Sequence, residues 1–220
     1  MQSMQNIMRV FTHDLRTPLL NIQALVQELG DQAVIMNEDM TETLDLLQQS
    51  ANRMDDMIVA ANDMYHCIFD ELEIEEVDMY ELFLRCFASL RLAEEGIALD
   101  CASMPLVEAD PLMTQRVVIE LLSNAKQAIA ANHVEGKRFI RISTMRDGSM
   151  AWFCIEDSGC GFNLGEVDKV FEPFFSGKNF SCGVGMGLTR AKALIEHQGG
   201  RIHIENVAHH AVVAFSLPMK

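Results

Sequence analysis

A histidine in the stretch FTHDLRTPL, residues 11–19, has the surroundings of a chemically active group. Met8, Phe11 and Leu15 follow steps of three and four, so they share one side of a predicted helix. With Met8 and Leu15 as a positions of a heptad, His13 falls at position f, opposite the apolar seam and toward solvent. An exposed neutral imidazole is a usable nucleophile. These residues alone also allow an idle surface histidine.

Two further segments carry polar and glycine residues suited to binding a ligand. In ELLSNAKQA, Glu120 and Asn124 stand four apart and share a helical face. A carboxylate and an amide oxygen can hold Mg²⁺, which keeps some of its waters. In DSGCGF, Asp157 ends an apolar run and can accept a hydrogen bond from an exocyclic amine, while Gly159 and Gly161 let the backbone approach a flat ligand. The alternatives are an ordinary exposed helix face and a tight turn.

A third segment, GVGMGL, opens a predicted helix with Gly183, Gly185 and Gly187. Glycines at a helix N-terminus present free N–H groups and the positive end of the helix dipole, which suits phosphate. The pattern is neither GxxxxGK[ST] nor GxGxxG, and taken alone it is weak. The preceding stretch FEPFFSGKNFSC places Lys178 within reach of a phosphate, in an aromatic and glycine-containing loop typical of a flexible lid.

Two kinds of element must position these groups. Residues 1–75 follow two heptad seams that predict a helical hairpin, with the first helix ending at Gly30 and the second running from about Met40 to Leu72. One hairpin buries too little apolar surface, so we expect it to pair with a second copy as a dimeric four-helix bundle. The alternative is a monomeric hairpin packed on the following domain.

Residues 76–220 mix helix and strand signals and predict an α+β domain, a mixed sheet with helices on one face. Asp110-Pro111 is a cap followed by proline at the first helical position, and Asp147-Gly148 is a hairpin turn. The expected helices cover 77–96, 111–131 and 188–198, and the expected strands cover 97–102, 138–146, 150–157, 201–206 and 211–218.

Composition excludes several classes of partner. With 17 Lys and Arg against 32 Asp and Glu, the chain has a formal charge of −15 and is a poor binder of nucleic acid or anionic membranes. The six cysteines form no CxxC pair, which favours reduced thiols of a cytosolic protein. No apolar run approaches the roughly 18 residues of a membrane span, so we expect no direct membrane contact by this part of the protein. The Met-rich start suggests that the natural chain extends further upstream.

In their order along the chain, ELLSNA, DSGCGF, FEPFF and GVGMGL resemble the N, G1, F and G2 boxes of the sensor histidine kinases of two-component systems. FTHDLRTPL resembles the H box of the same family, so the resemblance covers nearly the whole chain. It implies a dimeric phosphoacceptor hairpin over 1–75 and, over 76–220, an α/β sandwich of the GHKL type that binds ATP and Mg²⁺ under a mobile lid. It also implies a cytoplasmic location, either alone or as the cytoplasmic part of a membrane-bound sensor whose sensor domain lies upstream.

The implied activity is ATP-dependent autophosphorylation of His13, followed by transfer to an aspartate in the receiver domain of a response regulator. Asp14 would hold or accept a proton of the imidazole, and Thr17 would orient a water that removes the phosphoryl group from the regulator, so we also expect phosphatase activity. By the same resemblance, Asn124 and Glu120 are the Mg²⁺ residues. Asp157 receives the adenine amine and Gly159 and Gly161 shape its pocket, while the residues toward the phosphates are Lys178, Gly183, Gly185 and Gly187.

Two positions depart from the family pattern. Many members carry Asn where this chain has Glu120, and a glutamate there also resembles hydrolytic ATPases of the same fold, in which it activates water. Many members carry Lys or Arg three residues after Asn124, where this chain has Gln127, with Lys126 one position earlier. The alternative functions are therefore a GHKL-type ATPase that uses Glu120, and a phosphotransfer or scaffold protein with a decayed ATP site.

Overall fold

The computed structural model describes residues 19–20, 22–26, 43–48, 50–52, 54–55, 58, 71–132, 136–162, 169–172, 175, 185–207 and 210–219. The chain divides into two compact units, Met1–His66 and Cys67–Lys220. The domain boundary near residue 75 stays a prediction, as do the roles of the site residues that fall outside the described ranges: His13, Asp14, Thr17, Lys178 and Gly183.

The described residues of the first unit are helical and come from two segments that lie side by side. The Gln23 Nε2 donates a hydrogen bond of 2.9 Å to the Asn52 Oδ1, across 29 residues of sequence. Leu19, Val26 and Ala51 are buried. These contacts confirm the predicted hairpin for the described segments. Several large apolar side chains of the same segments remain exposed in the single chain: Leu20, Ile22, Leu25, Leu46, Leu47 and Met54.

The second unit is built on a five-stranded mixed sheet, as the sequence predicts. Its strand order is β2-β4-β5-β7-β6, in which β2 and β4 are parallel and the other neighbours are antiparallel. A second, two-stranded antiparallel sheet joins β1 and β3, and no sequence pattern predicted it. The strands are β1 Glu75–Asp78, β2 Ala98–Cys101, β3 Leu106–Ala109, β4 Phe139–Asp147, β5 Met150–Asp157, β6 Ile202–Val207 and β7 His210–Pro218.

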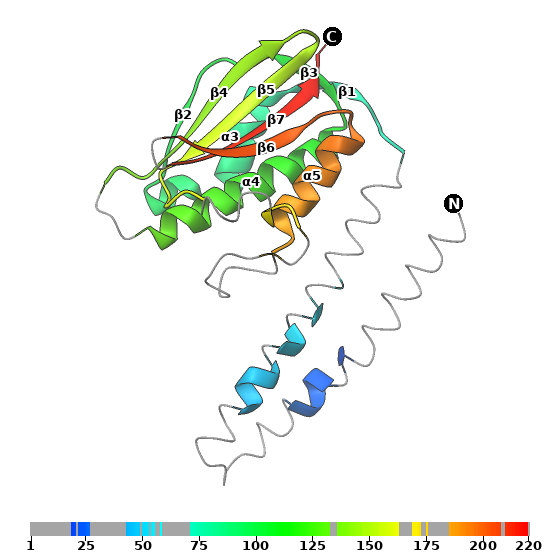
Figure 1. The fold of residues 1–220 in the computed structure, drawn as a ribbon, viewed down its shortest axis with the longest axis vertical. Coiled ribbons are helices and arrows are strands. Elements are labelled where there is room, and N and C mark those ends of the chain that lie inside the picture. Colours follow the sequence, from blue (N-terminus) through cyan, green and yellow to red (C-terminus); the bar gives the residue numbers. More distant parts are fainter. Residues whose placement is uncertain are drawn as a thin grey trace. The chain divides into compact units, whose positions relative to one another are not determined.

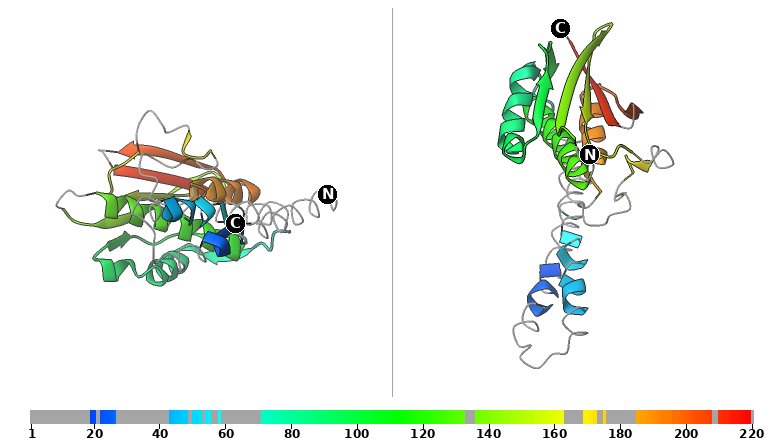
Figure 2. Two further views of the ribbon diagram at one scale, coloured as in Figure 1. Left: turned by 90° about the horizontal axis from the view of Figure 1, so that it is seen from below. Right: turned by 90° about the vertical axis from the view of Figure 1, so that its left-hand side faces the viewer.

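Within the described residues of this unit, three α-helices and one 3₁₀ helix accompany the sheet: α3 Met79–Ser89, η1 Leu92–Glu95, α4 Pro111–Ala131 and α5 Gly187–His197. Figure 1 and Figure 2 show them from three sides. The predicted single helix over 77–96 was wrong. The helix ends at Ser89 because Arg91 adopts a left-handed conformation with φ of 53°, and a short 3₁₀ turn follows it up to Gly96.

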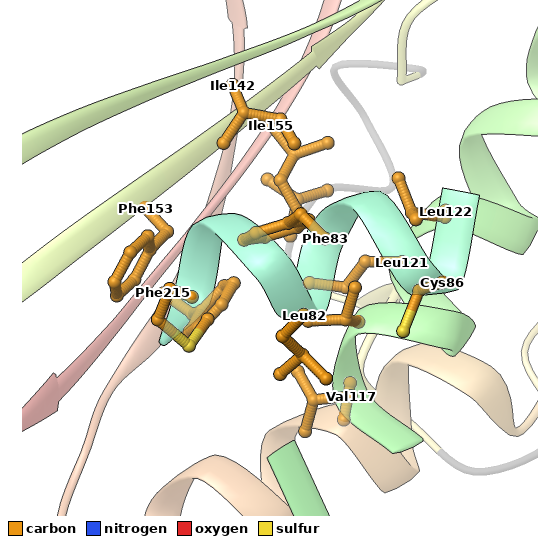
Figure 3. Packing of buried hydrophobic residues seen from close by; sticks show 14 of the residues in the cluster. Leu82, Phe83, Cys86, Val117, Leu121, Leu122, Ile142, Phe153, Ile155 and Phe215 are labelled. Carbon is orange, nitrogen blue, oxygen red and sulfur yellow. The ribbon is translucent and has the colours of Figure 1, made fainter. Parts of the chain in front are cut away.

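The core lies between the helices and one face of the sheet. Phe83 of α3 sits over Phe153 and Phe215 of the neighbouring strands β5 and β7, with ring centroids 6.3 and 6.5 Å away. Figure 3 shows the same helix turning Leu82 and Cys86 toward α4. This packing fixes α4 relative to the sheet through a continuous apolar layer, whose α4 members include Val117, Leu121 and Leu122.

A buried polar contact aligns α4 with α5. The Gln198 Oε1, just after α5, accepts hydrogen bonds from the Asp110 backbone N–H at 2.8 Å and from the Thr114 hydroxyl at 3.2 Å. The Asp110 side chain caps α4, as predicted, by accepting from the backbone N–H groups of Leu112 and Met113. The start of α4 therefore lies beside the end of α5. Because the helices are antiparallel, the start of α5 lies beside the middle of α4.

Two further expectations concern cysteines and membrane spans. The four cysteines within the described ranges, Cys86, Cys101, Cys154 and Cys160, are all free thiols, as expected. In the described part of the chain, no helix is long and apolar enough to cross a membrane.

Candidate functional site

The site is arranged along one face of α4. Glu120, Asn124 and Ala128 stand four residues apart and therefore form a single stripe on this helix. At 1.5 Å of rise per residue, the stripe spans about 12 Å. Its two ends meet different partners, the loop after β5 at the Ala128 end and the start of α5 at the Glu120 end.

At the Ala128 end, the loop after β5 lies directly against the helix. A Cβ atom on Gly159 would lie 2.6 Å from the Ala128 Cβ and 2.6 Å from the Asp157 Oδ1. The Gly159 backbone N–H donates a hydrogen bond of 2.8 Å to the same Asp157 oxygen. Glycine is therefore required here for close approach, and the turn fixes the carboxylate of Asp157 beside α4.

The Asp157 carboxyl group is buried at the end of β5, with 5% of its surface exposed. Burial raises its pKa to about 6, against the opposing effects of the Gly159 N–H and the nearby His210, and Glu156 raises the pKa further. At neutral pH the group is therefore an ionised, poorly solvated acceptor. Such a carboxylate binds strongly to a fixed N–H donor such as an exocyclic amine.

Two asparagines, which the sequence analysis did not single out, hold this loop at both ends. The Asn132 Nδ2 donates to the Ser158 carbonyl at 2.9 Å, and the Ser158 hydroxyl accepts from the Phe139 N–H at 2.9 Å. Asn206 of β6 pairs with both backbone groups of Phe162, accepting from its N–H at 2.8 Å and donating to its carbonyl at 2.6 Å. The loop is thus clamped before and after its glycines.

At the Glu120 end, Gly187 begins α5 in close contact with the stripe. A Cβ atom on Gly187 would lie 2.8 Å from the Glu120 Oε2 and 3.4 Å from both terminal atoms of Asn124. The cap position before it, Met186, makes no side-chain hydrogen bond to the first turn, and Gly185 has a φ of 71° that favours glycine. The positive end of an 11-residue helix is therefore directed at this part of the site.

The side-chain amide of Asn124 is poised for a ligand. Its Nδ2 is buried and has no hydrogen-bond partner. A buried polar atom without a partner costs roughly 1–3 kcal/mol, so in a folded protein it needs an explanation such as a bound ligand or ion. Among the described residues, no group of three or more His, Cys, Asp and Glu forms a metal cluster. The unpartnered atom is an N–H donor, which fits an acceptor such as a phosphate oxygen. The Asn124 Oδ1 and the Glu120 Oε2, which both lie against Gly187, are oxygen ligands of the kind that Mg²⁺ takes together with water and phosphate.

Arg190, a cationic residue that the sequence did not predict for the site, lies at the same end. The Arg190 Nη2, one turn into α5, pairs with the Glu120 Oε1, and these side chains are only 24% and 23% exposed. Lys126, one position before Gln127, instead pairs with Glu95 at 2.6 Å. The sequence holds no local signal for the Arg190 contact, since its two partners lie 70 positions apart.

The structure thus brings Glu120, Asn124 and Gly187 together at one end, and Asp157 and Gly159 together at the other. Two more predicted glycines flank these groups, Gly161 with a φ of 73° and Gly185. The arrangement provides a carboxylate acceptor, close backbone approach, an unpartnered amide and a helix N-terminus along one stripe. Those are the groups needed to bind a base at one end and an anion with its metal ion at the other.

Two family models match this chain. The model described as "Histidine kinase-, DNA gyrase B-, and HSP90-like ATPase" matches residues 109–220, which is just over half of the chain. The model described as "His Kinase A (phospho-acceptor) domain" matches residues 3–64. The first match contains the whole stripe of α4 and its two partner loops, and the second contains His13.

Curated relatives are identical to this chain at a little more than a quarter of the aligned residues. The alginate biosynthesis sensor protein KinB of Pseudomonas aeruginosa is 27% identical over 207 residues, covering 89% of this chain and 33% of that protein. The signal transduction histidine-protein kinase AtoS of Escherichia coli K12 is 29% identical over 205 residues, covering 91% of this chain and 32% of that protein. The chain therefore spans about a third of the length of these two relatives.

Solved structures share the fold. The mycobacterial sensor histidine kinase MprB superposes with a TM-score of 0.56 at 26% identity, covering 66% of this chain and 97% of that one. Full-length ShkA, solved in complex with AMPPNP, has a TM-score of 0.65 at 20% identity and covers 97% of this chain and 45% of that one. Histidine kinase AdeS of Acinetobacter baumannii has a TM-score of 0.59 at 22% identity, covering 94% of this chain and 98% of that one.

Proposed function

This chain belongs to the sensor histidine kinases of two-component systems, and we propose that it uses ATP to phosphorylate its own His13. The phosphoryl group then passes to an aspartate in the receiver domain of a response regulator. The acceptor is a neutral imidazole on the dimerisation hairpin, and the donor is a nucleotide held by the second unit.

The stripe of α4 is the observation that carries this proposal. Asp157 and Gly159 close one end of the stripe and Gly187 closes the other. In the proposed complex, the adenine amine donates to the Asp157 carboxylate, and the phosphates extend toward the first turn of α5. The family resemblance assigns phosphate contacts to Gly183 and Lys178 as well. Every described residue in this assignment is held by a contact seen in the structure.

Asn124 would hold Mg²⁺, with Glu120 beside it. When bound, the ion neutralises charge on the phosphates and makes the terminal phosphorus easier to attack. The protein itself does three things: Asp157 orients the base, Gly159 and Gly187 allow close backbone approach, and Asn124 offers an amide oxygen at the phosphate end. The positions of the Asn124 Oδ1 and the Glu120 Oε2 against Gly187 support this role, and the unpartnered Asn124 Nδ2 supports a hydrogen bond to a phosphate oxygen.

The hairpin supplies the rest of the proposed chemistry. A ring nitrogen of His13 attacks the terminal phosphorus, and the bond to the β–γ bridging oxygen breaks with its electron pair leaving on ADP. Asp14 holds or accepts a proton of the ring. Thr17 orients the water that later removes the phosphoryl group from the regulator, so the protein also acts as a phosphatase of its partner. Two copies of the hairpin form the four-helix bundle, because one copy leaves large apolar side chains such as Ile22 and Leu25 exposed.

Incubation with γ-labelled ATP tests the kinase proposal. We expect label on the protein that is stable in base and labile in acid, as a phosphoramidate is. His13→Gln should abolish the label while leaving nucleotide binding intact, and His203→Gln, a matched change at an exposed histidine of β6, should leave the label unchanged. Label that persists in His13→Gln would move the acceptor to another residue.

The same reaction separates the alternatives. Free phosphate without labelled protein would indicate an ATPase, and no nucleotide binding would indicate a scaffold. Adding a candidate receiver domain tests the later steps: label should leave the kinase and appear as acyl phosphate on the receiver. Thr17→Ala should slow only the removal of that acyl phosphate.

A further inference from the structure

The Glu120 carboxylate, an oxygen acceptor able to serve as a base, forms an ion pair with Arg190. Both residues lie at the Glu120 end of the α4 stripe, and the same glutamate lies beside Gly187 and one helical turn from Asn124. The pair therefore sits at the proposed phosphate end of the site rather than on a distant surface.

The pair is built into the packing of two helices. Arg190 lies one turn after Gly187 on α5, and its partner Glu120 lies on α4. Gln198, just after the end of α5, aligns the two helices through its hydrogen bonds to Asp110 and Thr114 at the start of α4. Each side chain is about a quarter exposed, so solvent screens this pair less than a pair on the open surface. Arg190 thus holds the carboxylate in one orientation.

Hydrolysis of ATP would require a different use of that carboxylate. The oxygen of a water molecule bonds to the γ-phosphorus, the bond to the β–γ bridging oxygen breaks with its electron pair leaving on ADP, and a base takes the proton that the water loses. Protonation of the Glu120 carboxylate would give up the charge pairing with Arg190, so the ion pair opposes this use of Glu120.

We propose that Arg190 is a positioning residue that withholds Glu120 from water, so that the bound nucleotide is spent on phosphorylating the protein and is not hydrolysed. This inference rests on the proposed kinase function. It gives a reason why the chain can carry a glutamate at the position where hydrolytic relatives use one. Whether bound ATP phosphorylates the protein or is hydrolysed then depends on Arg190, a residue of α5 outside the glycine motif GVGMGL.

The test measures release of labelled phosphate in a His13→Gln background, where no phosphohistidine can form and decay. Arg190→Met in this background should raise phosphate release about tenfold or more, since a general base typically contributes about 10²–10⁴-fold. Adding Glu120→Gln should return the release to its starting level, and Arg190→Lys should keep it low. Lys192→Met, a matched loss of charge on the same helix at a residue paired with Glu196, should change nothing.

Other outcomes overturn the inference. Release that does not rise in Arg190→Met, or that stays high after Glu120→Gln, means that Arg190 does not restrain this glutamate. Calorimetric binding of AMPPNP to the Arg190 variants that keep Glu120 should change less than threefold; a large loss of affinity without added hydrolysis would mean that Arg190 binds the nucleotide itself. Arg190→Gln provides a second neutral variant if the methionine variant unfolds early. Failure of the kinase proposal appears separately, as absent phosphoprotein in the unaltered chain.

Discussion

Gly159 and Ala128 touch so closely that no side chain fits between the loop after β5 and α4: a Cβ atom on Gly159 would lie 2.6 Å from the Ala128 Cβ. The same atom would lie 2.6 Å from the Asp157 oxygen that accepts the loop hydrogen bond. The position of the buried carboxylate therefore depends on the absence of a single methyl group.

Gly159→Ala should displace the loop and weaken nucleotide binding by at least about tenfold. The added methyl group must push away the helix or the carboxylate, and overpacking of this kind costs about 1–3 kcal/mol. Calorimetric titration with ADP measures the affinity, and thermal unfolding measures the cost to the fold. Gly136→Ala is the matched control, because a Cβ there meets nothing within 4 Å, and it should leave both quantities unchanged.

Asp157→Asn should stabilise the protein without nucleotide while abolishing most of its nucleotide binding. Burial raises the pKa of the Asp157 carboxyl from 3.8 to about 6, so the folded state binds this proton more tightly than the unfolded state. Stability therefore falls as pH rises from about 4 to about 6, and above pH 6 the ionised group costs on the order of 3 kcal/mol. Asparagine keeps an acceptor for the Gly159 N–H and carries no charge.

The measurement is the melting temperature of both proteins between pH 4 and pH 8. The variant should exceed the unaltered protein by roughly 6–12 °C at pH 7.5, and the difference should shrink toward pH 4, where the native carboxyl is protonated. Added ADP should raise the melting temperature of the unaltered protein only. A difference that stays constant with pH would show that the charge of Asp157 is not its source.

Asn206→Ala should loosen the far side of the same loop. The side chain makes two hydrogen bonds to the backbone of Phe162, and each bond contributes about 1 kcal/mol. We expect faster hydrogen exchange at the Phe162 amide and a nucleotide affinity lower by roughly 5–30-fold, the factor that corresponds to 1–2 kcal/mol. Glu205→Gln, at the exposed neighbour on β6, is the control and should alter neither quantity.

The elements that the sequence predicted correctly are those whose signals are local. The Asp110-Pro111 start of α4 and the turn at Asp147-Gly148 each depend on residues within a few positions, and the structure contains both. The same applies to the spacing of Glu120 and Asn124 along one face of α4. Their chemical roles, like that of His13, remain predictions from family resemblance.

The features that were missed depend on distant contacts. The strand over 75–78 is mostly acidic and exposed, and it forms only because it pairs with 106–109. The Asn206 clamp joins residues 44 positions apart, and the Arg190–Glu120 pair joins residues 70 apart. No local pattern distinguishes such side chains from ordinary surface residues. The break at Arg91 was missed because its left-handed backbone is rare outside glycine.

A change on the exposed seam of the first helix should separate the proposed dimer. Ile22 and Leu25 are 47% and 58% exposed in the single chain, although they continue the predicted heptad seam, while Leu19 and Val26 fill the hairpin interior. At 100° per residue, the two pairs lie on adjacent faces of one helix, as a four-helix bundle requires for its contacts within and between hairpins.

Leu25→Glu places a charge on the face proposed for the second copy, so the protein should sediment as a monomer at low micromolar concentration. Leu20→Glu is the matched control: Leu20 is 52% exposed but points away from the seam, so the same substitution there should leave the dimer intact. If both variants remain dimeric, the second copy contacts a different surface.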